Sequence, residues 1–152
     1  MWTTIIIFVL VAIIFNFIKF SKDTSAKKAE LQKVGGIKEK YKELISYFDD
    51  FDLYKQPTII TNDTNNYEIG WAGNTSIITI RMFEVLENLH VIFTSKMNEN
   101  EAKNMSQTLS NEQINTIREH INKKYEWKLN TGMRQTEMIE IISNDIQKLL
   151  GV

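Results

Sequence analysis

The sequence of 152 residues contains no cysteine and only one proline. Without cysteine the chain can form no disulfide, no thiol nucleophile and no cysteine-based zinc or iron–sulfur site. This lack is compatible with a reducing compartment. Because 43% of the residues are hydrophobic, the chain is too apolar to be disordered, and its length is enough for one small domain.

Charge is lacking at one end of the chain, where residues 1–18 carry no ionisable side chain. Residues 5–15 form an unbroken apolar run, and residues 2–20 would extend about 28 Å as a helix, close to the thickness of a hydrocarbon core. The segment is apolar on all sides, and it lacks the basic leader and the small-residue cleavage site of a signal peptide. The sequence therefore predicts a single-pass transmembrane anchor, a signal-anchor, over residues 1–20.

The anchor has an expected direction. The residues expected to contact lipid are Trp2, Ile5, Phe8, Leu10, Phe15 and Phe20. Lysines follow the apolar run and none precedes it, so the positive-inside rule places the N-terminus outside and residues 21–152 in the cytoplasm. Frequent Ile, Asn and Lys with few Ala are typical of an AT-rich bacterial genome, and the expected location is the bacterial inner membrane.

A basic neck follows the anchor, and an acidic body follows the neck. Residues 19–42 carry a net charge of +5, whereas residues 43–152 carry −6. Anionic headgroups attract each lysine near the bilayer surface by about 1 kcal/mol. The candidate headgroup contacts are Lys19, Lys22, Lys27 and Lys28. We expect the neck, residues 21–36, to lie along the membrane; alternatively, its lysines act only as a topology signal. Gly35 and Gly36 predict a hinge or helix stop at its end.

Residues 37–152 are expected to form one cytoplasmic domain of the α+β class. Apolar residues at helical spacing predict helices over 37–50, 110–125 and 134–150. The side chains expected to be buried are, in the first helix, Ile37, Tyr41, Leu44, Ile45 and Phe48, and, in the last, Met138, Ile141, Ile142, Leu149 and either Ile146 or Leu150. Ser110 and Gln113 predict a capping box at the start of the second helix. Alternating apolar and polar residues predict strands over 58–62, 67–72, 76–86 and 89–97. Between these elements, the sequence indicates a polar loop over 98–108 and a connection over 126–132 that can include a short extended piece. The predicted order is a helix, a four-stranded antiparallel meander and two C-terminal helices, packed in two layers.

Two predicted turns set the register of the strands. A two-residue turn at 73–74 places Ile69 opposite Ile78, and one at 87–88 places Phe83 opposite Ile92. Both turns put the same residues of the third strand on one face. We expect this face to be the core face, formed by Tyr67, Ile69, Trp71, Ile78, Ile80, Met82, Val91 and Phe93.

An apolar patch interrupts the otherwise polar opposite face of the predicted sheet. It consists of Phe83, Val85, His90 and Ile92, with Val85 opposite His90 in the predicted register. Such a patch is either covered by another element of the domain, which we expect, or available to a protein partner. It is the candidate partner surface.

No residue pattern for catalysis or cofactor binding is present. His90 and His120 lack the closely spaced His or carboxylate ligands of a zinc site, and a structural role is the expected one. Asp49, Asp50 and Asp52 form the densest acidic group, but a calcium loop needs more oxygen ligands and a turn glycine. We therefore expect no metal and no cofactor. Nucleic acid is disfavoured as a partner because the body is acidic.

These features favour a membrane-anchored, non-enzymatic protein whose cytoplasmic domain binds a protein partner, as an accessory subunit or adaptor of a membrane complex. The expected partners are the lipid bilayer and a protein, which can itself be a membrane protein. One alternative is an immunity or inhibitor protein that meets a toxin at the membrane. Another is a membrane-tethered hydrolase that uses carboxylates such as Asp49, Asp50, Asp52 or Glu84, although no activated nucleophile or paired base supports it.

Overall fold

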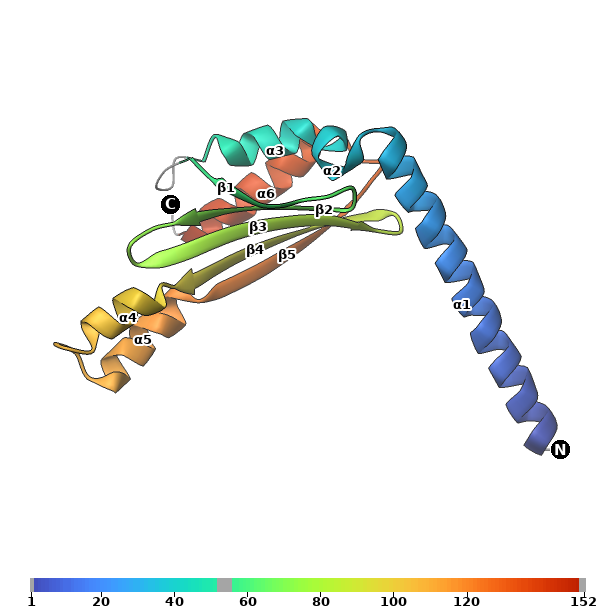
Figure 1. The fold of residues 1–152 in the computed structure, drawn as a ribbon, viewed down its shortest axis with the longest axis horizontal. Coiled ribbons are helices and arrows are strands. Elements are labelled where there is room, and N and C mark those ends of the chain that lie inside the picture. The colour runs from blue at the N-terminus through green and yellow to red at the C-terminus, as the bar shows by residue number, and fades with distance from the viewer. Residues whose placement is uncertain (1, 52–55, 151–152) are drawn as a thin grey trace.

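The computed structural model describes residues 2–51 and 56–150, and it describes no side chain at positions 2–5, 8, 149 and 150. The fold is of the α+β class, as predicted, with helices packed on a five-stranded antiparallel sheet (Figure 1). The strands are β1 (Thr58–Asn62), β2 (Asn66–Ala72), β3 (Ser76–Val85), β4 (Asn88–Met97) and β5 (Lys123–Asn130). The helices are α1 (Trp2–Lys33), α2 (Gly36–Lys40), α3 (Lys42–Asp49), α4 (Glu99–Met105), α5 (Asn111–Ile121) and α6 (Gln135–Leu150).

Helix α1 is one continuous helix of 32 residues that projects from the domain (Figure 1). Leu31 is the part of α1 that enters the core, and the chain then turns sharply at Gly35 and Gly36, whose φ angles are 90° and 88°. These positive angles favour glycine, and the predicted helix stop is confirmed. Among the helix residues whose side chains are described, no stretch has the length and apolarity of a membrane span.

The predicted anchor residues fall in the projecting half of α1. Leu10, Phe15 and Phe20 are exposed, while the side chains of Trp2, Ile5 and Phe8 lie outside the described ones. Most of the neck belongs to the same helix, so the anchor segment and the neck share one axis. The predicted crossing of the membrane and the predicted path of the neck along its surface are therefore incompatible for a single straight helix.

The strand order is β1-β2-β3-β4-β5, so each strand pairs with its neighbour in sequence. The four predicted strands are confirmed within a residue or so at their ends. A strand of the length of β5 was not predicted. It takes residues 123–125, which were predicted to end a helix, and most of the connection over 126–132, where only a short extended piece was expected. Its apolar residues Tyr125, Trp127 and Leu129 alternate with charged ones, which is the pattern of a strand with one buried face.

The predicted register was wrong by two residues in both hairpins. Ile69 pairs with Ile80, and Phe83 pairs with His90. The first turn contains residues 73–75, and the second contains Leu86, whose φ is 55°, with Glu87. The carbonyl of Glu87 accepts a hydrogen bond of 2.8 Å from the Thr131 N–H, a long-range contact that local turn rules omit. A shift of two residues keeps every side chain on its own face, so all eight predicted core residues of the sheet are buried.

Helices α2, α3 and α6 cover the core face of the sheet (Figure 1). The predicted helix over 37–50 is broken at Tyr41, where φ is −115°, into α2 and α3. Its predicted apolar stripe is buried: Ile37, Tyr41, Leu44, Ile45 and Phe48. In α6, Met138, Ile142 and Ile146 are buried as predicted, but Ile141 is exposed because the helix turns it away from the sheet. The predicted burial of Leu149 concerns a side chain outside the described ones.

Helices α4 and α5 form a helical hairpin at the far end of the sheet from α1 (Figure 1). Helix α4 replaces the predicted polar loop over 98–108, and the side chain of Asn98 caps its start. The predicted capping box of Ser110 and Gln113 is confirmed at the start of α5. The hairpin has a small core of its own, made of Met97, Ala102 and Ile114 with the partly buried Met105, Leu109, Ile117 and Ile121.

Candidate functional site

The face of the sheet opposite α3 and α6 is the candidate functional surface. No helix in the described part of the chain lies over the middle of this face (Figure 1). We call it the outer face, and its principal side chains are Glu68, Ile77, Thr79, Arg81, Phe83, His90, Ile92, Thr94, Lys96, Lys124, Glu126 and Lys128. The four residues of the predicted patch all belong to the two central strands, and Phe83, His90 and Ile92 are half-buried there.

The predicted patch is held together by ring contacts across β3 and β4. The rings of Phe83 and His90 are stacked, with centroids 5.0 Å apart and an angle of 10° between their planes. The guanidinium of Arg81 lies 5.3 Å from the centre of the Phe83 ring. Val85 is exposed, at the end of the ladder. The covering element that we expected is not found within residues 2–51 and 56–150, so the patch lies open at the surface.

His90 is oriented by a carboxylate on the neighbouring strand. Its Nδ1 lies 2.7 Å from Oε1 of Glu126. The hydrogen bond from His90 lowers the pKa of Glu126, and the positive charge of Lys128 acts in the same direction. Glu126 therefore remains ionised at a lower pH than an isolated glutamate. Only the unpredicted strand β5 brings this carboxylate beside the patch.

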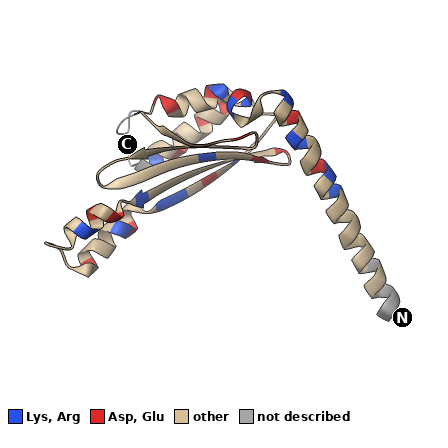
Figure 2. Cartoon of the chain, in the orientation of Figure 1, with Lys and Arg blue, Asp and Glu red and all other residues tan. Residues whose placement is uncertain are grey.

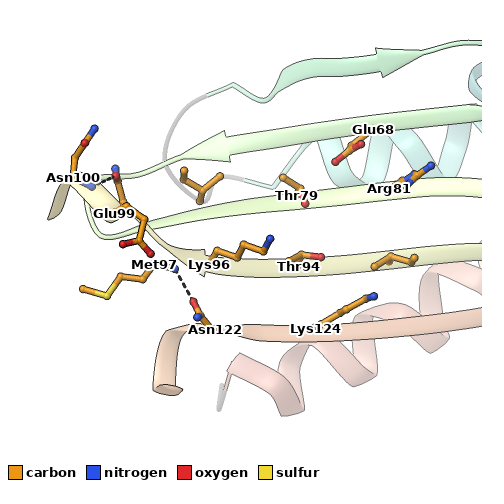
Figure 3. A pocket seen from close by; sticks show the side chains of 13 residues that line it. Glu68, Thr79, Arg81, Thr94, Lys96, Met97, Glu99, Asn100, Asn122 and Lys124 are labelled. Carbon is orange, nitrogen blue, oxygen red and sulfur yellow. Dashed lines mark hydrogen bonds between the residues drawn. The ribbon is translucent and has the colours of Figure 1, made fainter. Parts of the chain in front are cut away.

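A hollow of about 630 Å³ lies beside the patch, toward α4 (Figure 3). Its floor is formed by Thr79 and Thr94, two short side chains that face each other across β3 and β4. Longer side chains form its sides, including Ile77, Arg81, Ile92, Lys96 and Lys124. One end is closed where the Asn122 side chain accepts a hydrogen bond of 2.8 Å from the Met97 N–H.

The hollow is lined by three basic and two acidic residues, although the body as a whole is acidic (Figures 2 and 3). Glu68 lies opposite Arg81 on the neighbouring strand. Lys96 and Lys124 are exposed and form no ion pair with any residue that the structure describes. Arg81 donates a hydrogen bond of 3.0 Å to the side-chain oxygen of Asn66, which is an uncharged partner. Of the two acidic residues at the hollow, Glu99 is neutralised by Arg118 at 3.3 Å.

The carboxylates suggested for a hydrolase are not brought together. Glu84 lies on the core face beside α2, whereas Asp49 and Asp50 lie at the end of α3. Asp49 is the last residue of α3, and burial raises its pKa. Asp52 lies outside the described residues. Within the described ranges no three His, Asp or Glu side chains gather closely enough to hold a metal ion, and His120 is exposed on α5.

Glu84 belongs to a closed polar cluster rather than to an open site. Its side chain is 2% exposed, and Oε1 accepts hydrogen bonds from the Tyr41 hydroxyl at 2.5 Å and from Lys40 Nζ at 2.7 Å. Burial raises the pKa of Tyr41 well above its usual range, and the hydrogen bond and negative charge of Glu84 raise it further. Tyr41 is therefore a hydrogen-bond donor at neutral pH, and the cluster ties α2 to β3.

We expect the stabilising effect of Tyr41 to be lost in alkaline solution. The unfolded chain releases this proton near the ordinary pKa of 10.0, whereas the folded chain retains it, so stability falls as the pH rises above about 10. At pH 8, Tyr41→Phe should lower the free energy of unfolding by about 1.5–3 kcal/mol, since a hydrogen bond to a carboxylate is lost. Urea unfolding of both proteins at pH 8 and 10.5 measures the difference, which should shrink at the higher pH. A difference that stays constant would contradict this assignment.

The outer face combines a predicted patch with a hollow that sequence reasoning missed. The hollow depends on Lys124 of β5 and on the first residues of α4, and neither β5 nor α4 was predicted. The signal that would have found β5 is the alternation of Tyr125, Trp127 and Leu129. No family model matches the chain, and neither the curated proteins nor the solved structures include one with significant similarity to it.

Proposed function

We propose that this protein is a non-enzymatic, single-pass membrane protein whose cytoplasmic domain binds a protein partner through the outer face of its sheet. It would act as an accessory subunit or adaptor of a bacterial inner-membrane complex. The observation that carries the proposal is the open outer face, which joins stacked rings, aliphatic side chains and unpaired lysines on a surface that no described helix covers. Aromatic and arginine side chains in such a patch are typical of protein interfaces.

The projecting half of α1 supports the membrane part of the proposal. Its described apolar side chains are about half exposed on every side of the helix, from Ile6 to Phe20, and the domain offers no surface that buries them. A helix that is apolar all round requires an apolar environment. Because residues 1–18 carry no ionisable side chain, this segment has the composition of a helix inside a bilayer. The lysines that follow favour a cytoplasmic domain.

Co-purification of the full chain from mild detergent tests the proposal. We expect a membrane protein to be recovered with it in stoichiometric amount, identified by mass spectrometry. A chain that elutes alone as a monomer, after crosslinking in cells as well as without it, would contradict the function.

The patch variants Phe83→Ser and Ile92→Ser, made together, should reduce recovery of the partner by about tenfold or more, because hot-spot side chains dominate interface energies. Both side chains are only half-buried, so the thermal midpoint of the domain should change little. The matched control is Ile59→Ser with Ile141→Ser, which replaces two exposed apolar residues away from the outer face. Equal recovery with both double variants would place the partner elsewhere.

A further inference from the structure

The hollow on the outer face carries more specific information about the partner than the patch does. Lys96 and Ile77 face each other at the end near α4, and Arg81 and Ile92 face each other at the other end. Thr79 and Thr94 lie between these two pairs, and Lys124 lies beside Thr94 on β5. The lysines of the hollow make no ion pair in the described part of the chain. A ligand that complements this surface must present carboxylates to the basic side chains and apolar groups to the two isoleucines.

The position of α1 limits where such a ligand comes from. The projecting half of α1 extends to the same side of the sheet as the outer face, away from α3 and α6 (Figure 1). Phe20, the last apolar residue of that half, precedes Leu31, the first residue buried in the domain, by a helix length of about 17 Å. If the apolar half enters a bilayer, the outer face looks toward the membrane across a space of this order.

The size of this space favours protein over lipid as the occupant. A lysine side chain reaches only roughly 6 Å from the backbone, so the hollow is too far from the bilayer to bind headgroups directly. A helix with its side chains is about 10–12 Å across and fits the space. Basic side chains in the hollow also repel the lysines of the neck, which disfavours folding of α1 onto the same surface.

We propose that the hollow binds an acidic amphipathic helix of a membrane-bound partner, which lies between the sheet and the bilayer. Carboxylates of this helix pair with Lys96 and Lys124, and its apolar side chains rest on Ile77 and Ile92. This inference rests on the proposed function, since it names the class of partner segment that the outer face recognises.

A direct binding measurement tests the inference with the full chain, first in mild detergent and then in nanodiscs of phosphatidylcholine. The probe is a fluorescent helical peptide of about 18 residues, or five turns, built from Glu and Leu with its leucines along one side. Its counterpart carries Gln in place of every Glu. Binding is measured by fluorescence anisotropy at salt concentrations from about 50 to 300 mM.

We expect the Glu peptide to bind more tightly than the Gln peptide and to weaken as salt increases. The double substitution Lys96→Glu and Lys124→Glu should weaken binding of the Glu peptide on the order of tenfold, because two attractive contacts become repulsive. The control Lys42→Glu with Lys103→Glu makes the same change in net charge at two exposed lysines away from the hollow, and it should leave binding within about twofold. A third variant, Thr94→Trp, should block the hollow and weaken binding without any change in charge.

Three results would overturn the inference. The first is that the Glu peptide does not bind, and the second is that both pairs of lysine substitutions weaken binding equally. The third is that the variant with Lys96→Glu and Lys124→Glu binds anionic vesicles less well than the wild type but binds the peptide as tightly. The last result would assign the surface to lipid. Failure of the proposed function is a separate outcome. It appears as a full chain that elutes alone from mild detergent or does not enter nanodiscs, whatever its affinity for the peptide in detergent.

Discussion

Replacement of Val11→Lys together with Ile13→Lys is expected to move the full chain from the membrane fraction to the soluble or aggregated fraction. A lysine at the centre of a membrane helix costs about 2.5–3.5 kcal/mol on the scale of biological insertion. Two lysines therefore shift the equilibrium of membrane insertion by roughly three to five orders of magnitude. Both native side chains are 58% exposed in the structure, and neither contacts the domain. The substitution is therefore expected to affect the proposed membrane interaction and not the packing of the domain.

The measurement is fractionation of cells with a carbonate wash, followed by thermal unfolding of the domain in the soluble material. The control Ile59→Lys with Ile141→Lys adds the same two charges at exposed positions of the domain and should remain in the membrane fraction. Wild-type chain that is extracted by carbonate would show that α1 does not cross the bilayer. A double-lysine variant that stays with the membrane would show that another part of the chain holds it there.

The faces of the central strands were predictable from sequence because side-chain alternation has a period of two. Any error of two residues preserves it, and for this reason Ile80 and Met82 were assigned correctly although both hairpin registers were wrong. The turns themselves were less predictable. Leu86 adopts φ of 55° in a turn, and an apolar residue is not a turn signal.

Strand β5 and helix α4 were missed for a shared reason: their outward side chains dominate their composition. Charged and amide residues make up most of α4, and only the cap at Asn98 and the buried Ala102 relate it to the hairpin core. On β5 the lysines mark an edge strand, where charge discourages pairing with other chains. Local propensity therefore indicated a loop in place of α4, and a helix end followed by a connection in place of β5, where long-range packing forms regular structure.

The candidate site was predictable only in part, because aliphatic and aromatic residues are informative and short polar ones are not. Phe83 and Ile92 interrupt a polar face, and this contrast identified the patch. The hollow depends instead on two short side chains, Thr79 and Thr94. These are ordinary strand residues, and only their cross-strand pairing shows that they form a hollow. Its basic character also comes partly from Lys124, on the strand that was not predicted.

Trp127→Ala is expected to be the most destabilising single substitution considered for the domain, with a loss of about 3–5 kcal/mol in the free energy of unfolding. Trp127 is 4% exposed and lies on the core face of β5, and its Nε1 donates a hydrogen bond of 3.0 Å to Asp145 on α6. The truncation creates a cavity and also leaves the Asp145 carboxylate with one less donor. Small domains have about 5–15 kcal/mol of stability in total, so this loss is a large share.

Two further variants separate the packing of Trp127 from its hydrogen bond. Trp127→Phe retains much of the buried ring and removes the donor, and it should cost about 1.5–3 kcal/mol, the range for hydrogen bonds to charged groups. Tyr125→Ala removes a neighbouring exposed aromatic side chain whose hydroxyl donates a hydrogen bond of 3.5 Å to the same carboxylate, and its cost should be smaller than that of Trp127→Ala. Urea unfolding followed by circular dichroism measures all three. If Trp127→Ala costs less than about 1 kcal/mol, β5 does not belong to the cooperative unit, because a buried tryptophan in a packed sheet cannot be removed so cheaply.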